Sequence, residues 1–319
     1  MTKYPKISIV TPSYNQGQYI EQTILSVIGQ GYPNLEYIII DGGSTDNTVE
    51  IIKKFSDKIT YWISEPDNGQ SDALNKGLEK CTGEIFNWIN SDDYLEQNSL
   101  FKIAQYFIDN PSIELLCGYC TYFDSDTLKQ TFLHRSEIFE SVEETLIQQK
   151  INQPGSFYKL SIVKQLGGIN KDLHYCMDLE LWFRYLVQYG HKNMLLVEDL
   201  FAHFRLHDES KTVSLQGKFR EEEKLLWHHL LSGLKVNNHV VDFFKGNKTY
   251  TGDVVWKFGA INKARLVKHI CSKYFFDFYK VKRYGASKFA FLNLLSAGKL
   301  KFKQPYLGIF YNLFIKRVS

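Results

Sequence analysis

The sequence predicts an α/β protein built from parallel βαβ units in its first part, followed by a mainly helical carboxyl-terminal extension. Short runs rich in β-branched residues alternate with runs of helical apolar spacing over residues 1–110, the order typical of βαβ units. Polar clusters follow three of the predicted strands, at residues 12–15, 41–44 and 90–93. Ligands of open α/β sheets bind beyond the carboxyl ends of the strands, so we expect these clusters to line one crevice.

The elements of the first part follow one another in order. Apolar side chains at positions 20, 24, 27 and 28 have the spacing of a helix, and the apolar run before them predicts the first strand. The expected strands are 6–11, 37–40, 60–63 and 84–89. The expected helices are 19–30, 46–55, 71–80 and 95–107.

The pattern after residue 110 is less regular. Gly167 and Gly168 break the chain between two helical runs. The expected strands of this part are 114–123 and 194–197, and the expected helices are 156–166, 178–189 and 218–231. We find no internal repeat and no low-complexity linker.

The net charge of +3 conceals two parts of opposite sign. Residues 211–319 hold 21 Lys and Arg against six Asp and Glu, a net charge of +15, so residues 1–210 carry −12. With 44% hydrophobic and 23% charged residues, the chain of 319 residues is globular, which excludes disordered, collagen-like and disulfide-scaffold proteins. Its length favours about two domains, or one large domain with an appendage.

The amino-terminal residues and the cysteines favour a cytoplasmic protein. Residues 1–6 lead directly into a strand-like run, without the apolar core or the cleavage site of a signal peptide. No window reaches the ~18 consecutive apolar residues of a membrane span. The five cysteines are scattered. Cys117 and Cys120 form a single CxxC motif, which is a weak indication of a metal or redox site. We therefore expect buried thiols in a reducing compartment.

Two of the polar clusters have both a chemical and a structural interpretation. Asp92 and Asp93 place adjacent carboxylates at a strand end, where Mg²⁺ or Mn²⁺ bound with ligand phosphates would relieve their repulsion. Alternatively, one of them caps the helix at 95–107. The segment 41–46 is either a tight turn before a capped helix or a loop whose two glycines let the backbone approach a ligand. Neither motif decides between the two interpretations by itself.

Six motifs taken together closely resemble those of the bacterial family 2 glycosyltransferases. They lie at residues 9–15 (IVTPSYN), 39–48 (IIDGGSTDNT), 68–77 (NGQSDALNKG), 83–93 (GEIFNWINSDD), 177–184 (MDLELWFR) and 205–207 (RLH). The resemblance is specific at the level of the family. It implies a GT-A fold, in which a Rossmann-like nucleotide-binding half, residues 1–110, is fused to an acceptor-binding half, residues 111–210. The basic, aromatic-rich helical region 211–319 lies outside the resemblance.

The resemblance implies a donor site for a nucleotide-diphosphate sugar. The turn after the first strand would surround the nucleoside, and Asp41 would accept the N–H of a uracil ring. The segment that holds Asp72 and Asn75 would close over the nucleotide. The implied donor-binding residues are Thr11, Pro12, Ser13, Tyr14, Asp41, Ser44, Asp72, Asn75, Asn90, Ser91 and Asp92.

The resemblance also implies a divalent cation, Mn²⁺ or Mg²⁺. Asp92 matches the metal-binding carboxylate of the Asp-x-Asp motif, whose first Asp is replaced here by Asn90. A neutral amide contributes less to a cation, so metal affinity would depend mainly on Asp92. His207 matches a position that reaches the metal or the diphosphate, although a lone histidine also serves as a hydrogen-bonded structural residue. Arg205 and Lys211 can add positive charge to the same phosphates.

Asp178 matches the general base of the family, with Met177 where Glu is common. Inverting transfer to a hydroxyl needs one carboxylate to take the acceptor's proton, whereas a metal ion neutralises the leaving diphosphate. Alternatively, Asp178 only caps its helix. Trp182 lies on the same helical face and either offers its ring to the acceptor sugar or packs in the core. Glu180 and Arg184 have the spacing of a surface or local ion pair.

The segment 254–319 mixes Lys and Arg with aromatic residues, notably at 273–280 and 299–306. One interpretation is a solvated helical subdomain packed on the body. The other is a patch for the membrane surface, because basic residues attract anionic lipid and aromatic residues lie at the interface. The lipid-linked acceptors of many relatives favour the membrane. Nucleic-acid binding also suits the charge, but no recognition motif supports it.

We therefore predict a metal-dependent, inverting glycosyltransferase of hexosyl or N-acetylhexosaminyl type, with a UDP-sugar as the expected donor. The acceptor would be a saccharide or lipid-linked saccharide of a bacterial surface polysaccharide, at the inner face of the cell membrane. A sugar nucleotidyltransferase is the first alternative, but segment 12–17 has one Gly and no basic residue where a phosphate loop is needed. A non-catalytic binding protein of the same fold would be expected to lose Asp92 or Asp178. A dinucleotide oxidoreductase would need a GxGxxG motif after the first strand.

Overall fold

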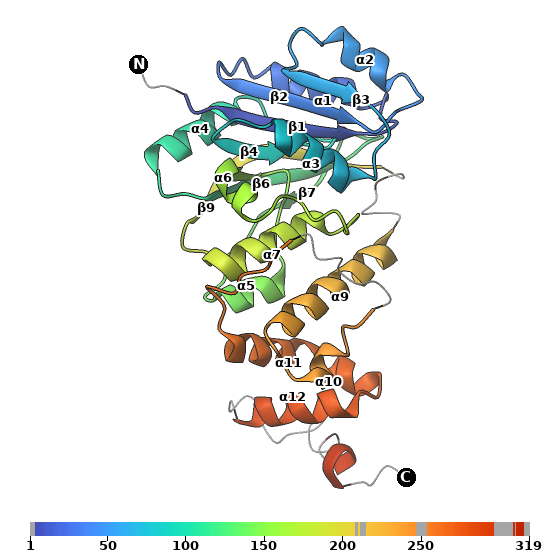
Figure 1. Cartoon of the computed structure of the whole chain (residues 1–319), viewed down its shortest axis with the longest axis vertical. Coiled ribbons are helices and arrows are strands. Elements are labelled where there is room, and N and C mark those ends of the chain that lie inside the picture. Colours follow the sequence, from blue (N-terminus) through green and yellow to red (C-terminus); the bar gives the residue numbers. More distant parts are fainter. Residues whose placement is uncertain are drawn as a thin grey trace.

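The upper part of the molecule is one mixed sheet with helices on both faces, and the lower part is helical (Figure 1). The computed structural model describes residues 4–207, 210, 215–246, 254–296, 309 and 311–315. In chain order, its strands are β1 (Ile7–Ser13), β2 (Leu35–Asp41), β3 (Tyr61–Ser64), β4 (Ile85–Trp88), β5 (Tyr94–Leu95), β6 (Leu115–Asp124), β7 (Gln130–His134), β8 (Ser156–Lys159) and β9 (Met194–Leu206). Their order in the sheet is β3-β2-β1-β4-β8-β6-β9-β5, and β7 pairs with β6.

Four parallel strands form the amino-terminal half of the sheet, as the sequence predicts. β1 pairs in parallel with β2 and β4, and β3 continues beyond β2. The connecting helices are α1 (Ile20–Ile28), α2 (Thr48–Lys54) and α3 (Gln70–Lys80). Successive side chains of a strand point to opposite faces, so Val10 packs with Leu74 of α3 in one core, and Ile9 packs with Ile24 of α1 in the other.

The sheet continues across residue 110 without a break. β8 lies antiparallel between β4 and β6, β9 runs parallel to β6, and β5 is antiparallel to β9. The helices of this part are α4 (Ser99–Asp109), α5 (Val142–Gln148), α6 (Leu160–Gln165) and α7 (Met177–Tyr189). The division at residue 110 into a donor half and an acceptor half stays a prediction about function within one sheet.

Two element predictions need correction. Residues 156–166 are not one helix, because the first four of them form β8 and fill the sheet between β4 and β6 before α6 begins. The short strand expected at 194–197 is only the start of β9, which extends to Leu206 because it pairs with β6 along most of its length. In both cases tertiary pairing decided the local structure.

The carboxyl-terminal region is helical, as predicted, and it shares a hydrophobic core with the body. Its helices are α9 (Gln216–Gly233), α10 (Asn238–Val241), α11 (Lys263–Lys280), α12 (Tyr284–Ser296) and the π-helical turn η1 (Tyr311–Ile315). Trp227 of α9 meets Phe183 of α7 with ring centroids 5.1 Å apart, and Ile270 and Phe278 of α11 are fully buried in the same core.

The expectation about the cysteines agrees with the structure. All five cysteines are free thiols, and all are buried. Within the described part of the chain, none of the helices has both the length and the apolar content needed to cross a bilayer.

Candidate active site

The polar clusters predicted at the strand ends lie together. β1 and β2 end side by side, with Ser13 paired to Asp41, and the backbone N–H of Asn15 donates to Ser44 Oγ at 2.7 Å. The pairing of β5 with β9 brings the end of β9 beside the loop that follows β4. We call this place, at the carboxyl ends of β1, β2 and β4, the carboxyl edge of the sheet. Open α/β sheets bind their ligands there.

Asp92 and His207 meet at the carboxyl edge. The imidazole Nε2 lies 3.1 Å from Asp92 Oδ2, and the exposed fractions of the two side chains are 24% for Asp92 and 7% for His207. The ring of Tyr19 lies 4.8 Å from the imidazole and restricts its orientation. Asp92 comes from the loop after β4 and His207 from the end of β9, so residues far apart in the sequence converge on one point.

This pair fits two ligands of a divalent cation. In octahedral coordination with bonds of ~2.1 Å, neighbouring ligand atoms lie ~3.0 Å apart, close to the 3.1 Å between Asp92 Oδ2 and His207 Nε2. No group of three or more His, Cys, Asp or Glu arranged to hold a metal occurs among the residues that the structure describes. The remaining ligands would therefore be water and donor phosphates, which is the usual way in which proteins hold Mg²⁺.

Asp93 is buried and stabilises the same loop. Its carboxylate accepts the backbone N–H of Arg205 at 3.0 Å and the side-chain amide of Asn90 at 3.1 Å. Burial, and then the charge of Asp92, raises the pKa of Asp93 well above its usual range. Asn90 accepts a further hydrogen bond from Gln70 Nε2 at 2.8 Å. Gln70 begins α3 and lies in the motif at 68–77, from which sequence reasoning selected Asp72 and Asn75 but not Gln70.

The loop is also held from α1. Ser91 is buried, and its carbonyl accepts the Thr23 hydroxyl at 2.9 Å. Asn98 occupies the N-cap position of α4, so neither Asp92 nor Asp93 caps that helix. The capping alternative is therefore wrong. The carboxylate of Asp92 lies at the carboxyl edge and does not take part in capping.

The sequence led us to expect that Arg205 adds positive charge to the donor phosphates. The structure instead places its side chain in contacts with other parts of the protein. Its guanidinium is sandwiched between the rings of Tyr19 and Phe123, 4.7 and 4.6 Å from their centroids. Its Nε donates to the Asp92 carbonyl at 2.9 Å, and a second nitrogen donates to Gln22. The side chain is therefore committed to positioning the loop. Lys211 lies outside the described residues.

The turn after β1 presents one exposed side chain. Thr11, Pro12 and Ser13 are buried, and Thr11 Oγ1 lies 3.2 Å from the Tyr37 hydroxyl. Tyr14 is 60% exposed. Of these four residues, only Tyr14 offers a free side-chain surface next to the carboxyl edge, and the other three shape the backbone of the turn.

Asp41 holds a tight turn, which is one of the two interpretations that the sequence left open. Its carboxylate accepts the backbone N–H of Gly43 at 3.2 Å and of Ser44 at 2.9 Å, and also the Ser44 hydroxyl at 2.5 Å. The Ser64 hydroxyl donates to it at 2.6 Å. Asp41 has no exposed surface, so in this structure it shapes the loop and does not face a ligand.

Asp72 and Asn75, expected to close over the nucleotide, have different surroundings. Asp72 accepts the backbone N–H of Asn68 at 3.2 Å, and its side chain is 13% exposed. The Asn75 amide donates to the carbonyls of Ser71 and Ile169 at 2.8 and 2.7 Å and accepts the Ile169 N–H at 3.0 Å. Asn75 therefore joins α3 to the turn after α6, and its amide is not directed at a ligand.

Asp178 lies in the first turn of α7. Cys176 occupies the N-cap position, so Asp178 is not the cap. Burial raises the pKa of Asp178, while the backbone N–H of Leu179 lowers it. The preceding loop is fixed by Glu222 of α9, which accepts the backbone N–H groups of Tyr175 at 2.8 Å and of Cys176 at 3.0 Å. Residues 221–223 are all glutamates, so the sequence did not indicate that Glu222 is the one whose side chain is buried.

The remaining predicted residues of α7 belong to its core face. Trp182 is fully buried, so its ring packs in the core and presents no face to an acceptor sugar, which corrects that expectation. Glu180 and Arg184 do form an ion pair, at 2.7 Å, but it is buried and not on the surface. Arg184 also donates to the carbonyls of Leu166 and Gly168, because α7 packs directly on the turn after α6.

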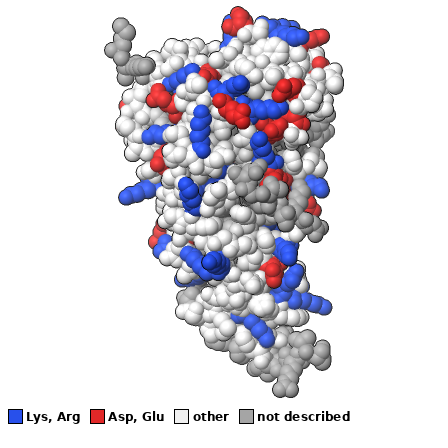
Figure 2. All heavy atoms as spheres, viewed as in Figure 1, with Lys and Arg blue, Asp and Glu red and all other residues white. Residues whose placement is uncertain are grey.

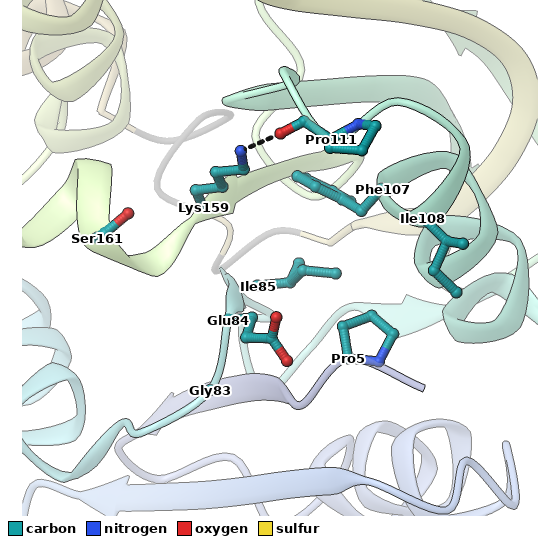
Figure 3. A pocket seen from close by; sticks show the side chains of 9 residues that line it. All are labelled: Pro5, Gly83, Glu84, Ile85, Phe107, Ile108, Pro111, Lys159 and Ser161. Carbon is teal, nitrogen blue, oxygen red and sulfur yellow. Dashed lines mark hydrogen bonds between the residues drawn. The ribbon is translucent and has the colours of Figure 1, made fainter. Parts of the chain in front are cut away.

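A separate cavity of about 740 Å³ lies at the opposite ends of the strands (Figure 3). Pro5 precedes β1, Glu84 precedes β4, and both line this cavity together with Phe107 of α4. Lys159 crosses above it and donates to the Pro111 carbonyl at 2.5 Å. The cavity is therefore at the amino edge of the parallel strands, which is not where sheets of this class bind nucleotides.

Comparison with known proteins identifies a family and a fold that this chain shares. Residues 8–163 match the family described as Glycosyl transferase family 2. The chain is 28% identical to an uncharacterized glycosyltransferase of Rickettsia typhi, over 73% of this chain and 74% of that protein. It is 33% identical to the putative teichuronic acid biosynthesis glycosyltransferase TuaG of Bacillus subtilis, over 42% of this chain and 54% of that protein.

Two solved structures share the fold. One is S. aureus TarS 1-349 in complex with UDP-GlcNAc, with a TM-score of 0.56 and 17% identity over 97% of this chain and 79% of that chain. The other is the mannosyltransferase PcManGT from Pyrobaculum calidifontis in complex with GDP-Man and Mn²⁺, with a TM-score of 0.54 and 16% identity over 98% of this chain and 80% of that chain. At such identities the likeness shows the fold alone. The matched family, the relatives and the fold agree: residues 8–163 belong to glycosyl transferase family 2, and the chain has a GT-A fold.

Proposed function

We propose that this glycosyltransferase binds a nucleotide-diphosphate sugar, specifically a UDP-sugar, at the carboxyl edge and transfers the sugar to a hydroxyl of a saccharide or lipid-linked saccharide. The observation that carries the proposal is the Asp92–His207 pair, 3.1 Å apart at the strand ends. The UDP-GlcNAc bound to TarS, and the GDP-Man and Mn²⁺ bound to PcManGT, support the donor class and the cation. The name of TuaG supports a product in surface polysaccharide synthesis.

The donor would lie along the carboxyl edge. The nucleoside would occupy the end near the exposed ring of Tyr14, beside the loop shaped by Asp41. The diphosphate would lie at the other end, where Asp92 and His207 hold the cation. Asn90 and Ser91 set the position of Asp92 through the hydrogen bonds of their loop.

We assign the proton transfer to Asp178. Its carboxylate would accept the proton of the acceptor hydroxyl while that oxygen attacks the anomeric carbon from the side opposite the leaving diphosphate, which inverts the configuration. The pKa of Asp178 is raised by burial, and a raised pKa makes a carboxylate a stronger base near neutral pH. When bound, the cation neutralises the charge that develops on the leaving diphosphate.

Thermal-shift and calorimetric titration of UDP, GDP and dTDP, each with and without Mn²⁺, tests the donor site. We expect stabilisation by UDP that requires Mn²⁺, and its loss in Asp92→Asn and in His207→Ala, because each substitution removes one of the two protein ligands. Asp57→Asn is the matched control, since Asp57 is an exposed acid after α2, away from the carboxyl edge. Equal stabilisation with and without Mn²⁺, or unchanged binding by Asp92→Asn, would contradict the assignment.

We also propose that the protein works at the inner face of the cell membrane. Residues 254–296 hold nine Lys and Arg against one acid, Asp277. Several of the lysines, including Lys280, Lys282 and Lys288, are exposed, and a basic surface of this kind is attracted to anionic lipid. The motif at 299–306 lies outside the described residues.

A further inference from the structure

Three aromatic side chains form a continuous row across one face of the sheet. The register of β6 with β7 pairs Tyr122 with Phe132, and the register of β6 with β9 pairs Tyr122 with Phe204. The ring centroids are 6.0 Å apart for Tyr122 and Phe132 and 4.7 Å apart for Tyr122 and Phe204. Directly paired residues of neighbouring strands lie on the same face. We call Phe132, Tyr122 and Phe204 the aromatic row.

The outer end of the aromatic row is open to solvent. Phe132 is 58% exposed, and β7 lies at the border of the sheet, where β6 is its partner strand among the described residues. Edge strands of natural proteins usually carry charged or polar side chains outward, because exposed apolar edges promote aggregation. Phe132 is not an isolated surface ring, because it continues into Tyr122 and Phe204, and a contiguous aromatic surface that reaches solvent can bind a ligand.

The inner end of the aromatic row, Phe204, lies beside the loop that carries Asp92. Phe204 directly precedes Arg205, whose backbone N–H donates to the Asp93 carboxylate at 3.0 Å. His207, the proposed partner of Asp92 in holding the cation, follows three residues after Phe204. An acceptor bound along the row would therefore approach the donor diphosphate, as transfer of the sugar requires.

A neutral polar group accompanies the aromatic row. His134 Nδ1 lies 3.2 Å from the Tyr122 hydroxyl, and the His134 ring is 5.9 Å from that of Phe132. Burial, and then the charge of Lys150, lowers the pKa of His134, so the imidazole is neutral at pH 7. A neutral imidazole and a phenol can both donate and accept hydrogen bonds, which suits hydroxyl groups and not a charged ligand.

We propose that the aromatic row, together with His134, is the acceptor subsite and binds the pyranose rings of an oligosaccharide acceptor. The inference deepens the proposed function and depends on it. A pyranose has a flat face of C–H groups and a rim of hydroxyls, so it packs against aromatic rings and hydrogen-bonds to a few polar groups beside them. Three rings in line, leading from the exposed edge of the sheet toward the loop that carries Asp92, fit a chain of more than one sugar.

The test uses the full-length protein and saturation-transfer NMR with cellobiose, lactose and N,N′-diacetylchitobiose as probes. We expect saturation transfer to at least one disaccharide in the wild type, and a reduction of about five- to tenfold in Phe132→Ala, the usual effect of losing one stacked ring. Phe132→Tyr should retain the signal. Leu128→Ala is the matched control, because Leu128 is 71% exposed near the turn of the same hairpin and outside the aromatic row.

Each other result overturns the subsite. Equal signals in the wild type and Phe132→Ala would do so, as would the absence of transfer to all three disaccharides in the wild type. A wild-type dimer that becomes a monomer in Phe132→Ala, measured by light scattering, would assign the row to a second copy of the chain. Titration of UDP with Mn²⁺ on the same samples separates the two proposals: unchanged UDP binding leaves the proposed function standing, whereas failure of the wild type to bind UDP contradicts the proposed function itself.

Discussion

The two carboxylates assigned chemical roles, Asp92 and Asp178, have different surroundings. Asp92 is 24% exposed and lies 3.1 Å from the imidazole of His207, an arrangement that suits a metal ligand. Asp178 lies in the first turn of α7, where burial raises its pKa. Two carboxyl groups whose environments differ in this way can divide the chemistry of a site between them. In the proposed mechanism the division is one cation ligand, Asp92, and one base, Asp178.

Asp178→Asn should reduce turnover strongly and leave donor binding unchanged. Removing a general base lowers the rate about 10²- to 10⁴-fold, whereas we propose that Asp92 and His207 provide the Mn²⁺-dependent affinity for UDP. UDP release from UDP-glucose, UDP-galactose and UDP-GlcNAc measures turnover, and calorimetry measures affinity. Near-wild-type turnover in this variant would remove Asp178 from the mechanism.

The same substitution should stabilise the fold at neutral pH. A carboxyl group whose pKa is raised by folding binds its proton more tightly in the folded state, so ionisation of Asp178 opposes folding as pH rises through the unfolded and then the folded value. The opposition is complete above the folded pKa. We therefore expect the Tm of Asp178→Asn to exceed that of the wild type at pH 7, and the difference to shrink as pH falls toward 4. A difference that grows on acidification would contradict this sign.

Asn75→Ala should destabilise the protein and leave UDP affinity unchanged. The substitution removes two hydrogen bonds that join α3 to the backbone of Ile169 and one to the Ser71 carbonyl within α3. An unsatisfied buried group costs about 1–3 kcal/mol. Urea unfolding measures this loss, with Asn110→Ala as control, because the Asn110 amide makes one exposed hydrogen bond. Weakened UDP binding with unchanged stability would restore the nucleotide role that the resemblance implied.

At the scale of elements, the position of α7 matters most, because this helix carries the proposed base. One anchor is the buried Glu180–Arg184 pair, whose arginine also reaches the carbonyls of Leu166 and Gly168. The other is Glu222 of α9, which accepts backbone N–H groups of the loop before α7. The helix carrying the base is therefore fixed from the body on one side and from the carboxyl-terminal region on the other.

Arg184→Met should destabilise the fold by about 3–5 kcal/mol, because it leaves the carboxylate of Glu180 buried without its partner. The double variant Glu180→Leu with Arg184→Met removes both charges and should recover a large part of that loss. Urea unfolding of the wild type, the two single variants and the double variant gives the coupling free energy. A double variant at least as unstable as Arg184→Met would show that packing, and not the unpaired charge, sets the cost.

The sequence predicted the elements of the parallel half well and those of the irregular half less well. The difference is whether an element's own residues are enough to indicate its structure. β1, β2 and α1 have clear apolar periodicity, so their positions follow from their own residues. β8 has no such pattern, and its residues become a strand because β4 and β6 lie on either side. Pairing partners far away in the chain decide such segments, and they are not visible in the local sequence.

At the scale of the whole molecule, the balance of acidic and basic side chains changes along the long axis. Figure 2 shows acidic and basic side chains mixed over the sheet, and mainly basic ones over the lower helices. The helical region does not stand apart, because Ile270 and Phe278 are fully buried in the core that includes α7. Both interpretations of this region thus retain a physical basis: it is packed on the body, and it presents a basic surface.

Charge reversal in the basic region should abolish binding to anionic vesicles. We expect the wild type to sediment with vesicles of phosphatidylcholine and phosphatidylglycerol, and not with phosphatidylcholine alone. The triple variant Lys280→Glu, Lys282→Glu, Lys288→Glu should remain in the supernatant, because each lysine near a membrane surface contributes about 1 kcal/mol. Deletion of the region is a poorer test, since it would expose the core shared with α7.

The matched control for this experiment reverses three exposed lysines on the sheet part. Lys53, Lys54 and Lys58 lie at the end of α2 and just after it, so the same change of net charge is made far from α11 and α12. The control variant should sediment like the wild type. Equal loss in both triple variants would mean that net charge alone governs binding, and unchanged sedimentation of the first variant would remove the membrane from the proposal.

The sequence by itself determined the family and the parallel half of the sheet, because these depend on motifs and on periodicity that are local in the chain. The resemblance implied a shared metal role for Asp92 and His207, but the pairing of β5 with β9 brings the two side chains together. Only the tertiary structure decided that Trp182 is core, that Arg205 is held between two rings and that the Asn75 amide joins α3 to a turn. A side chain's role depends on which partners surround it, and those partners come from distant strands and helices. The aromatic row of Phe132, Tyr122 and Phe204 likewise exists only through the register of three strands.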